Sequence, residues 1–280
     1  MSMIRQPAVA GLFYPGVGAE LEATVTALLD EVPAASGAAP KALIVPHAGY
    51  VYSGPVAASG YARLRAYRDR YRRAVLLGPC HRVPFRGMAV SGAAAFRTPV
   101  GDVPIDTAVV KNLIERLHGG EGVRIFDATH EHEHSLEVHL PFLQALLESF
   151  TLVPIVVGDA EPETVAHALD ILWGGPETLI VVSSDLSHYL EYDDARMRDE
   201  ATCRAIEKFE ARRIDYDDAC GAVPVGGMLV AAKRRGMVIE TVDLRNSGDT
   251  AGDRDRVVGY GAWVIREKSD SGTGAALMPD

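Results

Sequence analysis

Short apolar segments rich in β-branched residues alternate with helical patterns along this chain, and this alternation limits the fold more than any other feature. The segments are KALIVP (41–46), RAVLLGP (73–79), TLVPIVVG (151–158) and ETLIVVSSD (177–185). Buried strands that are separated by helices are typical of a parallel sheet in an α/β protein. We therefore expect an α/β domain with a largely parallel central sheet flanked by helices.

The remaining patterns fit the same architecture. Helices are predicted near 55–69, 106–118, 134–149, 162–173 and 193–210, with one more opened by Pro224, and strands near 123–126, 237–244 and 257–265. The 280 residues, of which 48% are hydrophobic and 24% charged, suffice for one sizeable core. We predict a single domain over residues 1–268 and a disordered C-terminal tail over 269–280, where small and polar residues predominate.

The composition argues against several classes of protein. No apolar run approaches the roughly 18 residues of a membrane span, and the N-terminus lacks a basic segment followed by a long apolar one, so we expect a cytoplasmic protein. The net charge of -10 argues against nucleic acids and anionic membranes as partners, because both attract basic surfaces. No glycine-rich phosphate-binding pattern occurs, so no nucleotide cofactor is predicted.

Three of the predicted strands end close to a histidine. His47 follows the first strand, His81 follows the second, and Asp185 and His188 follow the strand at 177–185. Open α/β sheets bind ligands beyond the carboxyl ends of their strands, where these side chains are expected to meet. Imidazole is the commonest protein ligand of metals and carries protons near neutral pH. This group therefore predicts a metal site, acid–base chemistry or both.

The three cysteines differ in their surroundings. Cys220 lies just before the helix that Pro224 opens, where a cysteine tends towards the thiolate that binds metals and attacks electrophiles. The alternative for Cys220 is a small buried apolar residue. Cys203 falls inside a helical pattern and is expected in the core, and Cys80 is expected to point away from His81 if the backbone there is extended. Three irregularly spaced cysteines predict neither a disulfide framework nor a zinc ribbon.

The histidine-rich segment THEHEHSLEVHLPFLQALL (129–147) has two interpretations. If residues 130–134 are extended, His130, His132 and His134 share one face and form a metal site by themselves. If a helix begins near Glu133 or His134 instead, His134 and Glu137 lie one turn apart and His139 turns away. Pro141 must then bend or restart that helix. Both interpretations leave His134 near the beginning of an element.

The segment ARLRAYRDRYRR (62–73) contains six arginines within eleven positions. At helical spacing, Leu64, Tyr67 and Tyr71 face inward while the arginines are solvated, which is the usual behaviour of such a segment. The alternative is a patch that binds an anion or a partner.

A series of motifs in a fixed order resembles a known family. The motifs are PAVAGLFYP, VPHAGYVYSGPVAA, LLGPCH, HEHSLEVHLPFLQ, VPIVVG, SSDLSHY, CGAVPV and VGYGAWV, and the match runs over residues 7–265. Together they resemble the Memo family, which includes the mediator of ErbB2-driven cell motility in animals and the AmmeMemoRadiSam system protein B of bacteria and archaea. The resemblance implies a single α/β domain similar to class III extradiol dioxygenases, which open catechol rings with non-haem iron.

The resemblance also implies a set of site residues. In the Memo pattern the metal ligands fall on His47, His81 and Cys220. The histidine that matches the catalytic acid/base of the dioxygenases is His188, and His134 and Asp185 line the same cleft.

The third ligand position departs from the dioxygenase pattern, which has two histidines and a carboxylate. A cysteine thiolate is softer, favours copper or zinc, and is itself oxidisable, so ring cleavage is not simply inherited. The family resemblance suggests iron or copper, and zinc is an alternative. Asp217 and Asp218 lie close enough in sequence to substitute if Cys220 points elsewhere.

Three functions follow as hypotheses. The first is a metal-dependent redox enzyme of unknown substrate, in which His188 moves a proton while Asp185 orients a polar group. The second is a binding or scaffold protein for a small molecule or peptide, with a radical S-adenosylmethionine enzyme of the AmmeMemoRadiSam set as a partner that the resemblance implies. The third is a metal-assisted hydrolase, because histidines and carboxylates at strand ends also suit zinc-bound water.

Overall fold

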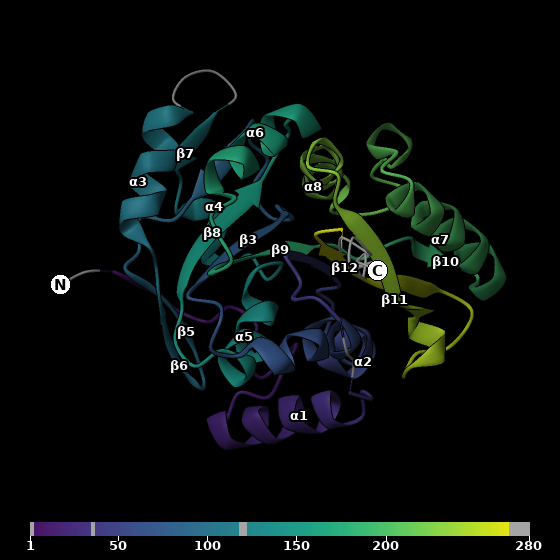
Figure 1. Cartoon of the computed structure of the whole chain (residues 1–280). Helices are drawn as coiled ribbons and strands as arrows, with labels where there is room; N and C mark the ends of the chain where they lie inside the picture. The colour runs from purple at the N-terminus through teal and green to yellow at the C-terminus, as the bar shows by residue number, and fades with distance from the viewer. Residues whose placement is uncertain (1–2, 35–36, 118–121, 269–280) are drawn as a thin grey trace, which may run out of the picture.

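The protein has three layers, with a central sheet between two layers of helices (Figure 1). A computed structural model describes residues 3–34, 37–117 and 122–268. The predicted disordered tail at 269–280 lies outside the described residues.

Four parallel strands form the centre of the main sheet. Their order is β2 (Ala42–Val45), β9 (Thr178–Ser183), β3 (Arg73–Pro79) and β8 (Thr151–Val157). Nearly every residue of these strands is buried, because helices cover both faces, which explains why the strands appear in the sequence as unbroken apolar runs. The predicted α/β fold with a largely parallel centre is confirmed.

The two ends of the sheet include antiparallel pairs. At one end β12 (Val257–Arg266) pairs antiparallel with β2, β11 (Val238–Asn246) and β10 (His188–Leu190). At the other end β4 (Met88–Val90) pairs antiparallel with β8 and parallel with β7 (Val123–Ile125). A separate small sheet contains β1 (Ile4–Arg5), β5 (Ala95–Thr98) and β6 (Gly101–Pro104). The pairs β11–β12 and β5–β6 need only short loops, since antiparallel strands require no crossover helix.

Helices cover both faces of the sheet (Figure 1). One layer contains α1 (Gly18–Asp30), α2 (Tyr50–Tyr61) and α5 (Leu140–Leu146), and the other contains α3 (Thr107–Arg116), α6 (Pro162–Leu172) and α8 (Ala222–Arg234). Helix α7 (Tyr192–Glu207) packs against β11 and β12. The shorter helices are η1 (Ala62–Tyr67), α4 (Ala128–Glu131), η2 (Glu137–His139), η3 (Ala211–Arg213) and η4 (Ser247–Asp249).

The predicted helix over 134–149 is shorter than expected. Residues 137–139 form the 3-10 helix η2, and the α-helix α5 covers only residues 140–146. Pro141 stands in the first turn of α5, because a proline there lacks only a hydrogen-bond donor that the first turn leaves unused. Its ring and missing N–H oppose one continuous helix from residue 134.

The interpretation of residues 130–134 as an extended three-histidine site is wrong. Residues 128–131 form α4, so the three side chains do not share one face. His130 is buried with its Nε2 3.2 Å from the Ala89 carbonyl oxygen, whereas His132 is exposed. Helical geometry at α4 therefore separates these two histidines from each other and leaves His134 in the loop that follows.

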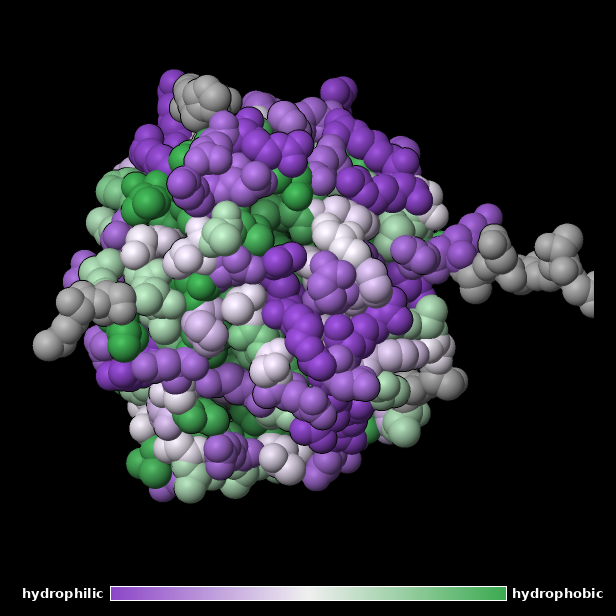
Figure 2. All heavy atoms as spheres, turned by 60° about the vertical axis from the view of Figure 1, so that its left-hand side comes forward, coloured by the Kyte–Doolittle hydropathy of each residue, from purple (hydrophilic) through white to green (hydrophobic). Residues whose placement is uncertain are grey.

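The arginine-rich segment is only partly solvated, because three of its six arginines are exposed and three are half-buried. Leu64 and Tyr71 are buried and Tyr67 is half-buried, as predicted, although only residues 62–67 are helical. Figure 2 shows one face of the molecule, where hydrophilic residues are spread widely and apolar residues form smaller groups between them. No helix of the described residues is long and apolar enough to cross a membrane.

A buried carboxylate attaches the N-terminal segment to the rest of the protein. Glu137 accepts hydrogen bonds from the backbone N–H groups of Ala8 and Val9, at 2.7 and 3.0 Å, and from the Tyr14 hydroxyl. It also forms an ion pair with Arg5, and both side chains are almost fully buried. These contacts hold the segment that carries Phe13, whose carbonyl accepts a hydrogen bond from the first N–H of α2, that of Tyr50.

Replacing Glu137 with alanine should destabilise the protein severely. The change leaves the buried Arg5 guanidinium without its counter-ion and three further donors without a partner, and breaking a buried ion pair costs about 3–5 kcal/mol. Urea unfolding followed by circular dichroism measures the loss. The matched control is Glu131→Ala at an exposed position, for which a change within about 0.5 kcal/mol is expected. Equal stability of the two variants would contradict this role of Glu137.

Candidate metal centre

Three histidine rings meet at the carboxyl edge of the parallel strands. His47 follows β2, His81 follows β3, and His134 lies in the loop between α4 and η2. One potential ligand atom from each lies within 4.8 Å of the other two. The ring centroids are 4.7 to 5.4 Å apart. His47 is buried, His134 is half-buried and His81 is exposed, so the cluster extends from the interior to the surface.

A close backbone approach brings His134 to this edge. A side chain at Gly78 of β3 would place its Cβ 2.9 Å from Ser135 Oγ and 2.9 Å from Leu136 Cδ2. Glycine therefore lets the loop after α4 pack directly on the end of β3. Ser135 Oγ then donates a 2.7 Å hydrogen bond to the Pro79 carbonyl, which fixes the loop and its neighbouring His134 beside the strand end.

Ser183, the last residue of β9, determines which nitrogen of His47 carries a proton. Its hydroxyl donates to the Ser135 carbonyl at 2.6 Å and lies 2.6 Å from His47 Nδ1 and 2.8 Å from His139 Nε2. A hydroxyl has one proton, so both histidine nitrogens must be the donors. Burial and the neighbouring histidines lower the pKa of His47 well below its usual range. The ring is therefore neutral, and its Nε2 offers a free lone pair.

Glu133 determines which ring nitrogen of His81 carries a proton. Its Oε1 accepts from His81 Nδ1 at 2.8 Å, and its Oε2 accepts from the His81 backbone N–H at 2.6 Å. The backbone N–H groups of His134 and Ser135 donate to Oε1 as well. Burial alone would raise the pKa of Glu133, but His81 and these donors lower it to about 2. The arrangement leaves His81 Nε2 free, as in histidines that bind metals while a carboxylate holds their other nitrogen.

Sequence reasoning missed Glu133, Ser183 and His139. The acid of HEHEH is visible in the sequence, but its partner His81 is 52 positions away. Ser183 and His139 likewise meet only through the fold, because they are 44 positions apart in the sequence. The alternation of acids and histidines in HEHEH was the one sequence signal for these residues, and it did not indicate which histidine each acid binds.

The chemistry of this set fits a metal ion. His134 Nδ1 is buried and lies 3.3 Å from Glu133 Oε1 without forming a hydrogen bond, and burial lowers the pKa of His134 to about 4, so the ring is neutral near pH 7. A buried nitrogen whose hydrogen-bonding capacity is unused is costly in free energy. Coordination of a cation by neutral imidazoles would offset that cost, and two of the three rings already have their tautomers fixed.

Cys220 adjoins the cluster at His47. Its Sγ lies 3.4 Å from His47 Nε2 and 3.6 Å from the Asp185 carbonyl oxygen. A Cβ at Gly221 would lie 2.6 Å from the Ser183 carbonyl oxygen, so only glycine permits this approach of the chain to the end of β9. Asp217 is exposed, so it does not take the place of Cys220.

Asp218 does not take the place of Cys220 at the cluster either. Its carboxylate accepts from the backbone N–H of Asp215 and lies 4.0 Å from Arg198, on the outer side of the loop. The prediction that Cys220 tends towards the thiolate is wrong for the metal-free protein. Burial raises the pKa of the thiol well above its usual range, and the Asp185 carboxylate raises it further. Desolvation thus outweighs the nearby helix N-terminus.

Asp185 and His188 complete the site. Asp185 Oδ1 accepts from the His47 backbone N–H at 2.7 Å, and burial raises the pKa of Asp185 to about 7. His188, the first residue of β10, lines a cleft of about 450 Å³ together with Asp185 and His134. The structure therefore brings together all six predicted site residues. Of the other cysteines, Cys203 is buried in α7 as predicted.

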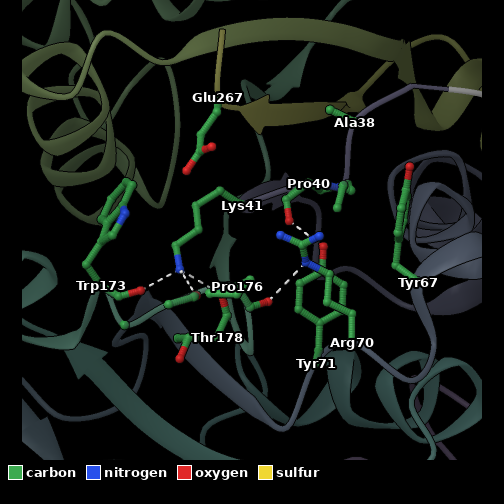
Figure 3. A pocket seen from close by; sticks show the side chains of 13 residues that line it. Ala38, Pro40, Lys41, Tyr67, Arg70, Tyr71, Trp173, Pro176, Thr178 and Glu267 are labelled. Atoms are coloured by element: carbon green, nitrogen blue, oxygen red, sulfur yellow. Dashed lines mark hydrogen bonds between the residues drawn. The ribbon is translucent and has the colours of Figure 1, made fainter. Parts of the chain in front are cut away.

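A larger cavity, of about 700 Å³, lies at the opposite edge of the sheet (Figure 3). Lys41 enters it just before β2 and donates to the carbonyl oxygens of Trp173, Gly175 and Thr178. These bonds use all three protons of the ammonium group. Arg70 Nε donates to the Pro176 carbonyl in the same way. Both cations hold a loop to the sheet, and none of the predicted site residues lines this cavity.

Loss of the Glu133 carboxylate should weaken metal binding. The Glu133→Gln variant is expected to bind Zn²⁺ about 10–100-fold less tightly, because the amide has one acceptor oxygen where the carboxylate uses two to hold the ring and backbone of His81, and it lacks the negative charge. Competition with a chromophoric chelator measures the change. Glu131→Gln, an exposed acid of the same segment, is the control and should bind as the parent does. Equal weakening in both variants would argue against orientation by Glu133.

Proton release should reveal whether Cys220 is a ligand. The pKa values of His47 and His134 are lowered and that of Cys220 is raised, so near pH 7 the rings are neutral and the thiol is protonated. Ligation by the thiolate must release a proton, and affinity then rises with pH. Calorimetry in buffers of different ionisation enthalpy counts the protons. About one proton fewer is expected for Cys220→Ser; an equal count would exclude the thiolate.

Comparisons with known proteins agree on a family. The model of the family described as "Memo-like protein" matches residues 5–264. A MEMO1 family protein of Aquifex aeolicus (strain VF5) is 36% identical, with 92% of this chain and 97% of the relative covered. One of Methanococcoides burtonii is 36% identical over 94% of this chain and 100% of the relative, and one of Nitrosopumilus maritimus is 34% identical over 93% and 98%.

Among solved structures, the uncharacterized protein JW3007 from Escherichia coli K12 has a TM-score of 0.54 at 13% identity, covering 80% of this chain and 99% of that chain. At this identity the likeness supports the fold alone. The family model and these relatives extend over nearly the whole sequence, and the range that the family model matches includes every residue of the candidate metal centre. The chain therefore belongs to the Memo family.

Proposed function

We propose that this protein is a metal-dependent redox enzyme whose ion is held by His47, His81 and Cys220. The observation that carries the proposal is the pair of fixed tautomers: Ser183 and Glu133 leave the Nε2 lone pairs of both histidines free at one sheet edge. Cys220 Sγ lies 3.4 Å from one of these nitrogens. Two imidazoles and a soft thiolate suit copper or iron. Such an ion supplies Lewis acidity and one-electron chemistry when bound.

The residues around the ligands would handle protons. Asp185, with a pKa of about 7, changes protonation close to neutral pH, as an efficient proton donor or acceptor must. Burial lowers the pKa of His188, so its ring is ready to accept a proton from a substrate in the cleft. His134 lies in the same cleft, and its buried Nδ1 forms no hydrogen bond. We assign proton transfer to His188 and orientation of a polar substrate group to Asp185.

A hydrolytic function is the second candidate, and the same donor set favours it. Zinc prefers four ligands, and two histidines with one cysteine leave one position for water. The metal itself separates the two functions, because zinc has no redox chemistry. Element analysis of protein purified from its native cells without chelators identifies the ion.

The metal content of variants tests the ligand set. The purified parent is expected to contain close to one redox metal ion per chain, and His47→Ala and Cys220→Ser are each expected to lose it, because each removes a donor atom. His132→Ala, at an exposed histidine outside the cluster, should keep the parent content. Inductively coupled plasma mass spectrometry gives the ratios. Unchanged metal in both ligand variants would refute the proposed centre.

A further inference from the structure

The cleft above the metal centre combines an apolar wall with a polar floor. His134, Asp185 and His188 lie at its inner end. Leu12 and Val51 line it nearer the surface, where their side chains are 81% and 64% exposed. Apolar side chains left in water beside a polar site mark a surface that binds something. The volume of about 450 Å³ is within the range of small-molecule sites.

Arg256 supplies the positive charge of this cleft. Among the residues that line the cleft it is the one arginine or lysine, and its guanidinium forms no ion pair within the described part of the chain. The guanidinium lies 5.1 Å from the centre of the Tyr189 ring. Stacking of this kind occupies the face of the guanidinium and leaves its N–H edge available for an oxyanion.

The backbone at Tyr189 is strained, and the strain places the ring of this residue. Tyr189 has a φ of 61°, in the left-handed region that residues other than glycine rarely adopt. Its ring lies 5.7 Å from the ring of His188 and beneath Arg256, yet 64% of the residue is exposed. Such strain is concentrated at functional sites, where the surrounding structure maintains it. The surrounding structure therefore holds the stacked pair of Arg256 and Tyr189 in place at the cleft mouth.

We propose that the substrate is a small molecule with an apolar body and a single carboxylate, and that Arg256 binds this carboxylate at the mouth of the cleft. A planar guanidinium and a planar carboxylate form two parallel hydrogen bonds. The apolar wall then receives the body of the molecule and directs its other end to His188 and Asp185. The chemistry done on that end rests on the proposed function, whereas the binding of the carboxylate does not.

The other charges of the cleft favour one negative charge over two. Asp253 also lines the cleft, and its Oδ1 accepts from the backbone N–H groups of Asp255 and Arg256 at 3.1 and 3.4 Å, so it stays close to the arginine. Asp185 adds a second acid at the inner end. A phosphate dianion would be repelled by both carboxylates, while a carboxylate is balanced by Arg256 alone.

The same loop contains a matched control. Arg254 is also exposed and also stacked on a tyrosine, at 4.2 Å from the centre of the Tyr192 ring, but it does not line the cleft. Arg254→Gln and Arg256→Gln remove equal charge from positions two residues apart. A difference between these variants therefore reports on the cleft and not on the net charge of the loop.

Isothermal titration calorimetry on the full metal-free chain tests the proposal with 3-phenylpropionate, the neutral 3-phenylpropanol and 2-phenylethyl phosphate. The parent and Arg254→Gln are expected to bind the carboxylate about tenfold more tightly than the alcohol. Arg256→Gln should bind both equally, with an unchanged melting temperature. Absence of saturable carboxylate binding to the parent, equal binding of the carboxylate and alcohol, tighter binding of the phosphate, or equal loss in the two variants would overturn the proposal.

Metal content, measured on each preparation before the metal is removed for calorimetry, separates this test from that of the proposed function. Arg256→Gln is expected to keep the metal content of the parent, because Arg256 lies at the mouth of the cleft and not among the histidines. If the parent protein contains no metal but still binds the carboxylate more tightly than the alcohol, the metal centre alone is refuted. If the parent protein contains metal but binds the carboxylate and the alcohol equally, the substrate class alone is refuted.

Discussion

The parallel register of β2, β9 and β3 is the constraint on which the site depends. Val45 pairs with Ser183 and Leu77 with Val182, so the three strands end at one edge of the sheet. Parallel neighbours need crossover connections, and the helices on both faces provide them. The residues that follow the strands are therefore distant in sequence and adjacent in space. Apolar packing of the strands keeps those positions in place, since shifting one strand would disturb a closely packed core.

Buried hydrogen-bond acceptors, each surrounded by several donors, fix the position of the loop that carries His134, although this loop has little regular structure. Glu133, Ser183 and Glu137 each receive several hydrogen bonds, from the strand ends, the histidines and the N-terminal segment. In a poorly solvated interior an unpaired polar group is expensive, so such networks resist rearrangement. The loop that carries His134 is held from both sides by them. Ring orientation at the cluster thus follows from polar contacts that belong to the fold itself.

Burial also sets the charges that a cation and a substrate would meet. The pKa values of His47 and His134 are lowered, and that of the Cys220 thiol is raised, so these three groups carry no charge near pH 7 in the metal-free protein. Glu133 remains ionised, with a pKa of about 2. Negative charge thus lies beside the cluster and positive charge, on Arg256, at the cleft mouth. This separation would orient a monoanion with its uncharged end towards the metal.

The sequence by itself determined the α/β layering and the placement of His47, His81 and Asp185 at strand ends, because buried strands show as apolar runs and their last residues can be counted. The tautomers of His47 and His81 and the position of His134 depended on contacts across 52 to 136 residues, which no local pattern encodes. The protonated state of Cys220 depended on burial and on Asp185, and both arise only when the strands and α8 pack together. Tertiary structure decided these features because desolvation and hydrogen-bond pairing act through space and not along the chain.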